Sequence, residues 1–308
     1  MNPIIIIAGP TGIGKTETVL KLAEPLGGEV ISADSVQVYK RMDIGTAKPT
    51  PEERARVRHH MIDVVEPDAL FNAAIFREMA EPIIQRLHAS GKPVFVAGGT
   101  GLYIKVLSRG IFPCPEGDKE IRQRFKAEAN THGRHMLFDR LQAVDPVSAA
   151  KTHPNDTYRI IRALEVFELT GRPFSEHHNA HRFQETRYRT LKIGLTMDRA
   201  IVYEQIEQRV DRMLEQGLLD EVKGLLNNGF SPDLKSMQSI GYSHAVKFLQ
   251  GRLSLDEMVH TLKRDTRRYA KRQLTWFKAD PEMIWLEPDE IDDMRKRIDV
   301  FLESYPAS

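Results

Sequence analysis

The sequence predicts an α/β fold in which a parallel sheet flanked by helices carries an inserted, all-helical domain. Three observations predict this class. Short apolar runs alternate with stretches of helical spacing over the first hundred residues, which is typical of parallel strands joined by covering helices. Polar or glycine-rich segments follow three of those runs, at residues 9–16, 34–39 and 98–103. Helical spacing then replaces the alternation through the middle of the chain.

The first hundred residues contain the predicted sheet. Strands are expected at residues 4–8, 29–33 and 93–97. A helix is expected over residues 16–26, and residues 71–87 also have helical spacing, with Pro82 expected to kink or split that helix. Because ligands collect beyond the carboxyl ends of parallel strands, the three polar segments should meet at one edge of the sheet.

The chain changes character at Cys114, whose flanking prolines predict a linker. Three helices are predicted next, at residues 120–129, 135–144 and 156–170. The last of them should be capped by Asn155 or Asp156 and should end at Gly171. Residues 174–189 are predicted to be irregular because they are polar and lack periodicity.

The α/β pattern returns near residue 190. A strand is predicted at residues 191–196, and Asp198 should cap a long amphipathic helix. Further helices are expected to the end of the chain. The predicted core therefore comprises residues 1–113 and 190–308, and the predicted insertion comprises residues 114–189.

Composition narrows the class of protein. The single cysteine excludes an internal disulfide and argues against a zinc site built from cysteines. No apolar run approaches the length of a membrane span, and the N-terminal run is too short for a secretory signal. We therefore expect a cytoplasmic protein with no membrane segment. A monomer is also expected, although the sequence does not give the oligomeric state.

Residues 9–16 fit the phosphate-loop pattern Gly-x4-Gly-Lys-Ser/Thr and lie between a predicted strand and a predicted helix. Loop N–H groups and the helix N-terminus would surround an anion. Lys15 would reach the outer phosphate, and the Thr16 hydroxyl could hold Mg²⁺. The pattern predicts a core like that of phosphate-loop NTPases and a site for a di- or triphosphate. The predicted anion-binding residues are Gly9, Pro10, Thr11, Gly12, Ile13, Gly14, Lys15 and Thr16.

Two further strand ends carry candidate chemistry. Asp34 could bind a metal or act as a base, or it could simply form a turn. Ser35 and Gln37 beside it would suit the edge of a nucleobase. The glycines around Thr100 allow a ligand to approach closely, or they serve a turn that needs small residues. The strand before Thr100 lacks the terminal Asp expected of a nucleotide-hydrolysing motor.

Residues 263–278 combine helical spacing with seven Lys or Arg and one acid. Such a run is either a solvated surface or a surface for a phosphate backbone, and the near absence of acids favours the second, with salt-sensitive binding. Arg159 and Arg162, with Arg122 and Arg124, could form a second basic surface.

His59, His60 and Asp63 lack diagnostic metal-ligand spacing, so structural roles are expected for them. The histidines at 177, 178 and 181 are expected at the surface.

Together these motifs resemble the tRNA dimethylallyltransferases, also called tRNA isopentenyltransferases, of the bacterial type. The matching blocks are Gly-Pro-Thr-x-x-Gly-Lys-Thr at 9–16, Asp-Ser-x-Gln-Val-Tyr at 34–39, Asp-Ile-Gly-Thr-Ala-Lys-Pro at 43–49, Arg-His-His-Met-Ile-Asp at 58–63, Gly-Gly-Thr-Gly-Leu-Tyr at 98–103, Arg-Ala-Leu-Glu at 162–165, Ser-Ile-Gly-Tyr at 239–242 and Arg-Arg-Tyr-Ala-Lys-Arg-Gln-Leu-Thr-Trp-Phe at 267–277. Phosphate loops are widespread, whereas the blocks at 34–39, 43–49 and 267–277 are far more specific in combination.

The resemblance implies a reaction with Mg²⁺ as cofactor. N6 of the adenine that is 3′-adjacent to the tRNA anticodon attacks dimethylallyl diphosphate, and pyrophosphate leaves. Asp34 would be the base, Thr100 would lie near the attacking amine, and Lys15, with Arg209, would bind the diphosphate. The insertion would grip the anticodon stem-loop. Implied or predicted tRNA contacts are Asp34, Ser35, Val36, Gln37, Thr100, Arg122, Tyr158, Arg159, Ile160, Ile161, Arg162, Arg267, Arg268, Lys271, Arg272 and Gln273.

Three other functions share part of this pattern. A nucleotide or small-molecule kinase would use the same loop with ATP, but it has no need for the basic helix. An enzyme that prenylates free adenine nucleotides would be expected to have a reduced insertion. A non-catalytic RNA-binding protein with a nucleotide switch would retain its function after an Asp34→Ala change.

Overall fold

The computed structural model describes residues 2–111, 115, 117–181 and 186–304. It divides into two compact units, Met1–Ser108 with Arg187–Ser308 and Arg109–Thr186. The second unit occupies the part of the chain where the sequence predicted an insertion at residues 114–189. Cys114 and the centre of the predicted linker lie outside the described residues. Each unit is described by itself below.

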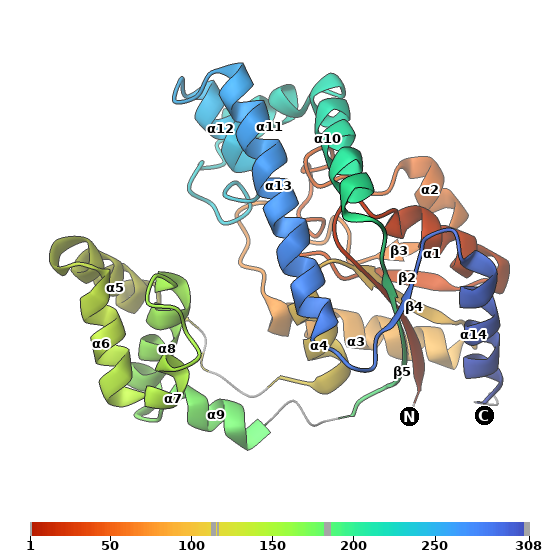
Figure 1. The fold of residues 1–308 in the computed structure, drawn as a ribbon, viewed down its shortest axis with the longest axis horizontal. Coiled ribbons are helices and arrows are strands. Elements are labelled where there is room, and N and C mark those ends of the chain that lie inside the picture. The colour runs from red at the N-terminus through yellow and green to blue at the C-terminus, as the bar shows by residue number, and fades with distance from the viewer. Residues whose placement is uncertain (1, 112–114, 116, 182–185, 305–308) are drawn as a thin grey trace. The chain divides into compact units, whose positions relative to one another are not determined.

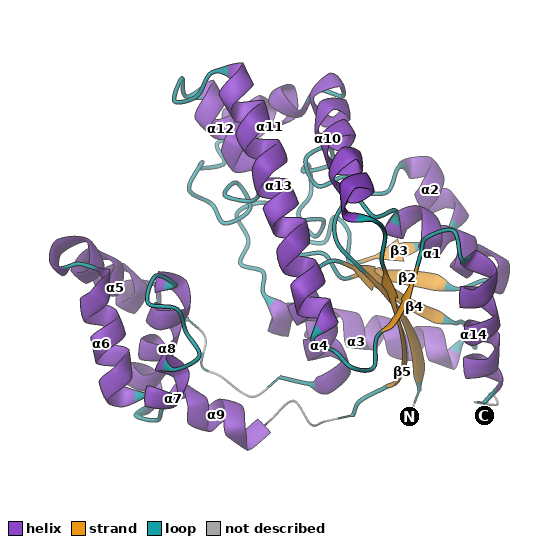
Figure 2. Ribbon diagram, in the orientation of Figure 1, coloured by secondary structure: helices purple, strands orange, loops and turns teal. Residues whose placement is uncertain are grey.

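The first unit contains a six-stranded parallel sheet (Figures 1 and 2). Its strands are β1 (Pro3–Ala8), β2 (Glu29–Ser32), β3 (His59–His60), β4 (Val94–Gly98), β5 (Arg189–Leu195) and β6 (Ile284–Leu286), in the spatial order β3-β2-β4-β1-β5-β6. Ala8 on the central strand is level with Gly98 on one side and Gly194 on the other. The carboxyl ends of the central strands therefore form one edge, as the sequence predicted.

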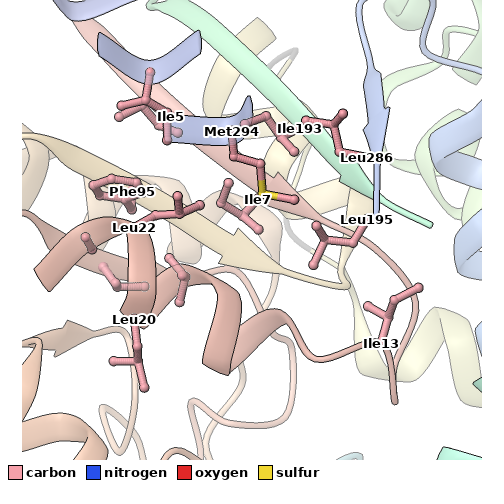
Figure 3. Close-up of a cluster of buried hydrophobic side chains, with 14 of the residues drawn as sticks. Ile5, Ile7, Ile13, Leu20, Leu22, Phe95, Ile193, Leu195, Leu286 and Met294 are labelled. Carbon is pink, nitrogen blue, oxygen red and sulfur yellow. The ribbon is translucent and has the colours of Figure 1, made fainter. Parts of the chain in front are cut away.

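Both faces of the central strand are buried. Ile5 and Ile7 belong to one hydrophobic cluster with Phe95, Ile193 and Met294 (Figure 3). Ile4 and Ile6 alternate with them and are equally buried. Burial on both faces explains why β1 is a continuous apolar run rather than an alternating one. The α/β prediction with a parallel sheet is confirmed.

Helices of the first unit connect and cover the strands (Figure 2). They are α1 (Lys15–Ala23), the 3₁₀ turn Glu24–Leu26, α2 (Pro51–Arg56), α3 (Ala73–Ala89), α4 (Gly101–Arg109), α10 (Arg199–Glu215), α11 (Leu218–Asn227), α12 (Tyr242–Leu249), α13 (Leu255–Lys278) and α14 (Ile291–Glu303). Asp198 caps α10 by accepting a hydrogen bond from the Ala200 N–H, as predicted. None of the helices in the described residues has the length and apolar composition needed to cross a bilayer.

Of the two outcomes expected at Pro82, a split helix is wrong and a kink stays a prediction, and several short elements were not predicted. Pro82 does not split its helix, because α3 runs without interruption from its Asn72 cap, with Phe76, Ala80 and Ile84 buried on one face. Packing of that face offsets the single backbone hydrogen bond that the proline removes. The strands β3 and β6 and the helix α2 were not predicted, since two, three and six residues are too few to show periodicity.

The second unit is helical, with α5 (Lys119–His132), α6 (Arg134–Val144), α7 (Pro146–Ala149), α8 (Thr157–Thr170) and α9 (Phe174–His181). Its core includes Phe125, Leu137 and Leu164. Asp156 caps α8, and Gly171 ends it in the left-handed conformation, as predicted. The expectation that residues 174–189 are irregular was wrong for α9. A residue distant in sequence stabilises the start of α9, because the Ser175 N–H donates to Asp145 Oδ2 at 2.8 Å.

Candidate active site

The phosphate loop joins β1 to α1, in the strand–loop–helix order that the sequence predicted. Gly14 precedes α1 with a φ of 89°, a value that favours glycine. The Lys15 ammonium donates to the Pro10 carbonyl at 2.8 Å, so the side chain folds back over its own loop. Burial, reinforced by the nearby Arg209 charge, lowers the pKa of Lys15 to about 8. The Lys15 ammonium is therefore poorly solvated, and the nearby Asp34 carboxylate only partly offsets this.

Two cavities meet at Asp34. The smaller, of about 50 Å³, is lined by Lys15, Thr16, Asp34 and Gln37. The larger, of about 320 Å³, is lined by Asp34, Val36, Arg209 and Tyr269, among others. The carboxylate thus borders both the anion site and a space in the range of small-molecule pockets.

The Asp34 carboxylate also forms a turn. Its Oδ1 accepts from the Val36 N–H at 2.8 Å and from the Gln37 N–H at 3.2 Å. Within the described residues, no hydrogen bond to Oδ2 is recorded. The turn and the functional interpretation are therefore compatible. Oδ1 holds the side chain in the turn, and this leaves Oδ2 to accept a proton or bind a metal.

Thr100 is tied to the same turn. Its hydroxyl oxygen accepts from the Ser35 N–H at 3.0 Å, and its own N–H donates to the Ala33 carbonyl at 3.1 Å. Tyr269 interacts with the Thr100 hydroxyl, and burial raises the pKa of Tyr269 to about 12, with Asp34 contributing. Two of the three predicted catalytic residues, Asp34 and Thr100, are thereby held on adjoining backbone.

Arg209 reaches the site from α10. Burial lowers the pKa of its guanidinium, and the charge of Asp34 opposes that shift. Its Nη2 donates to the Thr46 carbonyl at 3.5 Å. The Arg209 charge is close enough to lower the pKa of Lys15, so an entering dianion would be attracted by both cations.

Gln37 acts as an internal brace. Its amide nitrogen donates to the Thr46 carbonyl at 3.3 Å and the Ala47 carbonyl at 3.2 Å, and its amide oxygen accepts from the Ser32 hydroxyl at 2.9 Å. The predicted contact with a nucleobase would have to displace these bonds. Ser35 and Val36 line the larger cavity, and within the described residues no hydrogen bond of their side chains is recorded.

The glycines before α4 make room for α13. A Cβ atom on Gly99 would lie 2.1 Å from the Gln273 amide nitrogen, and one on Gly101 would lie 2.1 Å from the Trp276 ring. The Gln273 side chain fills this gap: its oxygen accepts from the Thr11 N–H at 2.9 Å, and its nitrogen donates to the Gly99 carbonyl at 2.9 Å. Gln273 is therefore a buried link between two loops, and its predicted contact with tRNA stays a prediction.

Much of the charge on α13 is paired within the protein. Lys263 pairs with Asp211, Arg267 with Glu207, and both Arg264 and Arg268 pair with Asp265. Among the described residues, the cations of α13 without a carboxylate partner are Lys271, Arg272 and Lys278. Arg272 also lies over the Tyr269 ring, 5.7 Å from its centroid, and lines the larger cavity. The surface open to a polyanion is narrower than the sequence suggested.

In the second unit, the predicted tRNA contacts separate into three groups. Ile160 and Ile161 are 1% and 5% exposed and pack in the core, so their side chains stabilise the fold, and a tRNA contact at these two positions stays a prediction. Arg122 and Arg162 both pair with the buried Glu165, at 2.8 and 2.5 Å. Tyr158 and Arg159 are exposed at the start of α8.

Glu221 is a functional candidate that the sequence analysis missed. Its Oε2 accepts from the Asp43 and Ile44 N–H groups, each at 2.8 Å, and its Oε1 accepts from the Gly45 N–H at 3.2 Å and the Tyr242 hydroxyl at 2.5 Å. The carboxylate thereby fixes the loop whose next residue, Thr46, meets Arg209 and Gln37. Nothing in the sequence distinguishes Glu221 from its neighbour Asp220.

Oxygen donors for a hard cation are present beside the loop. Thr16, Ser32 and Asp34 line the smaller cavity together with Lys15. No group of three or more His, Cys, Asp or Glu side chains suited to a metal occurs in the part of the chain that the structure describes. Mg²⁺ commonly binds through one or two protein oxygens and substrate phosphates, so the residues present fit that ion in the presence of a diphosphate. His59 and His60 instead contact the Val57 carbonyl and the Glu29 carboxylate.

Comparison with known proteins gives consistent results. The family described as "IPP transferase" matches residues 37–280. A tRNA dimethylallyltransferase of Desulfatibacillum aliphaticivorans is 53% identical, over 97% of this chain and 98% of that one. The crystal structure of the full-length tRNA isopentenylpyrophosphate transferase of Bacillus halodurans has a TM-score of 0.74 at 41% identity, covering 99% and 98% of the two chains. A eukaryotic dimethylallyltransferase described as acting on tRNA has a TM-score of 0.78 at 30% identity, covering 94% and 74%.

Proposed function

Because the chain belongs to the IPP transferase family of tRNA dimethylallyltransferases, we propose that it transfers a dimethylallyl group from dimethylallyl diphosphate to tRNA. The acceptor is N6 of the adenine 3′-adjacent to the anticodon, and pyrophosphate is released. The observation that supports this most directly is the position of Asp34, which borders both the anion site and the larger cavity.

The leaving group is met by positive charge. As the bond between C1 of the allyl group and the diphosphate oxygen breaks, negative charge grows on the diphosphate. Lys15 lines the smaller cavity and Arg209 lines the larger one, and their charges are close enough to interact, so both can stabilise the charge that develops there. A Mg²⁺ ion held by Thr16 and the phosphates would add further positive charge there.

The nucleophile needs a base. The adenine N6 lone pair is delocalised into the ring, so N6 attacks C1 effectively only as its proton is removed. Asp34 accepts that proton through the carboxylate that its turn holds in place. Thr100, bonded to the same turn, positions the amine. The adenine must leave the loop stack to reach this cavity, which costs least in a single-stranded loop.

The family relationship disfavours a kinase. A kinase would transfer phosphorus and use ATP, whereas the relatives named above transfer a prenyl group. We also propose a cytoplasmic location for the protein, since tRNA is found there. The monomeric state stays a prediction.

The test is transfer of label from radiolabelled dimethylallyl diphosphate to tRNA in the presence of Mg²⁺. We expect label in tRNA, no dependence on ATP, and no label on a stem-loop in which N6 of the target adenine is replaced by oxygen. Absence of label with the unmodified tRNA, or transfer of phosphorus from ATP, would contradict the proposal.

Glu221→Gln should lower kcat/KM for dimethylallyl diphosphate, although Glu221 does not line either cavity. Loss of its charge weakens three backbone hydrogen bonds at 43–45, so the Thr46 carbonyl no longer fixes Arg209 and Gln37. Hydrogen bonds to a charged group contribute about 1.5–3 kcal/mol, so kcat/KM for dimethylallyl diphosphate should fall by about 10- to 100-fold. The exposed neighbour variant Asp220→Asn is the control, and equal kinetics for the two variants would exclude this role.

Pyrophosphate binding should depend on the protonation of Lys15. Since the pKa of Lys15 in the folded protein, about 8, lies below its usual 10.5, the free enzyme loses this charge as pH rises through 8. Affinity relative to a Lys15→Gln variant should therefore be greatest below pH 8 and decline above it. Isothermal titration calorimetry of both proteins measures this ratio, from which the ionisation of pyrophosphate itself cancels. A ratio that stays constant from pH 6.5 to 9.5 would show that burial does not control this charge.

A further inference from the structure

The helical unit contains a pocket whose lining includes Tyr158 and Arg159, two of the tRNA contacts that the resemblance implies, but whose occupant nothing above identifies. Its volume is about 310 Å³, and it lies between α7, the start of α8 and the start of α9. Its walls are apolar or aromatic, from Val147, Ala163, Tyr158 and Phe174. This volume is at the lower end of the range of small-ligand sites.

The pocket combines exposed apolar surface with positive charge. Val147 and Tyr158 are 45% and 74% exposed, which places two large apolar side chains at its rim. Lys151 and Arg159 also line it. Arg159 pairs loosely with Asp156 at 3.3 Å, and no ion pair of Lys151 is recorded within the described part of the unit. A ligand with a flat apolar body and a negative group would satisfy both features.

The walls are held in place before any ligand binds. The buried Asp145 accepts from the Ser148 N–H at 2.9 Å and hydroxyl at 2.6 Å, and from the Ser175 N–H at 2.8 Å. These bonds tie the start of α7 to the start of α9, on which Phe174 lies. Preorganised walls reduce the ordering cost of binding.

We propose that this pocket binds one unstacked nucleobase of the tRNA anticodon loop, with Lys151 and Arg159 at its phosphate. The inference rests on the proposed function, which supplies an RNA loop as the partner. The base is a second one, distinct from the target adenine, which enters the cavity beside Asp34. Single-stranded loops are recognised in this way, by bases stacked on aromatic side chains and by cations at the backbone.

The experiment measures affinity for an anticodon stem-loop. Tyr158→Ala, Phe174→Leu and Lys151→Gln are compared with wild type and with two controls elsewhere in the unit, Leu169→Ala and Lys126→Gln. Leu169 is an exposed apolar residue on the same helix as Tyr158, and Lys126 is an exposed lysine. We expect the Kd to rise by about 5- to 150-fold for Tyr158→Ala, the range found when one base loses its stacking partner, and to stay unchanged in the controls.

Abasic stem-loops identify the base. An abasic site is placed in turn at each unpaired position except the target adenine. At one position the abasic loop should bind wild type more weakly, and Tyr158→Ala should then weaken binding no further, because the two changes remove the same contact. 2-Aminopurine at that position should change fluorescence on binding to wild type and not to Tyr158→Ala.

Two results would overturn the proposal. If wild type transfers label to tRNA but the Kd of Tyr158→Ala and Phe174→Leu equals that of the controls, the pocket does not bind the loop. If Tyr158→Ala weakens all abasic loops equally, the pocket contacts the backbone and holds no base. Failure of wild type to modify tRNA would instead contradict the proposed function, so the two are distinguished.

Discussion

Replacing Asp34 by Asn lowers the rate of prenyl transfer by about 10²- to 10⁴-fold, the usual contribution of a general base. Asparagine has the same shape, and its side-chain oxygen can still accept from the Val36 and Gln37 N–H groups. The turn therefore persists while the proton acceptor is lost. Asp34→Asn should therefore slow only the chemical step, and binding of both substrates should be retained.

The measurement is the single-turnover rate with tRNA and dimethylallyl diphosphate both saturating. Binding of tRNA to Asp34→Asn should stay within a few-fold of wild type, because the RNA contacts proposed above are intact. Asp68→Asn, an exposed carboxamide change elsewhere in the first unit, is the matched control. A rate for Asp34→Asn within threefold of wild type would mean that another group removes the N6 proton.

Replacing Glu165 by Gln unfolds the helical unit locally. The Glu165 carboxylate is fully buried and accepts from the Asp118 N–H at 2.7 Å, from Arg122 Nε at 2.8 Å and from Arg162 Nη1 at 2.5 Å. Without its charge, two guanidinium groups face each other with no anion between them. Removing one partner of a buried ion pair costs about 3–5 kcal/mol.

Hydrogen exchange of the full chain measures this effect by region. Amides of α5 and α8 should exchange about 10²- to 10⁴-fold faster in Glu165→Gln, while amides of the sheet should be unchanged. Glu176→Gln removes an exposed pair with Arg172 in the same unit and should have almost no effect. Equal protection of α8 in the two variants would show that the buried pair does not stabilise the unit.

Arg122 and Arg162 show why these residues are ambiguous from sequence. Both were expected to contact tRNA, and both are partners of a buried carboxylate in the folded unit. A guanidinium serves an internal carboxylate and an external phosphate with the same donors. The sequence therefore does not distinguish a guanidinium that pairs with Glu165 from one that contacts a phosphate.

The sequence alone determined the four longer strands β1, β2, β4 and β5, the phosphate loop and the position of Asp34 at a strand end. Those features depend on neighbours within a few residues, through apolar runs, glycines with positive φ and the alternation of strands with helices. The family motifs likewise lie in short blocks.

Only the tertiary structure decided which polar side chains face inward. Gln273 reaches the Thr11 N–H across 262 positions of sequence, and Glu221 reaches the Asp43 N–H across 178. Each side chain has the same hydrogen-bonding capacity at the surface and in the interior, so its role depends on which backbone groups the fold brings beside it. Composition and motif spacing do not indicate which distant backbone group will lie beside a given side chain.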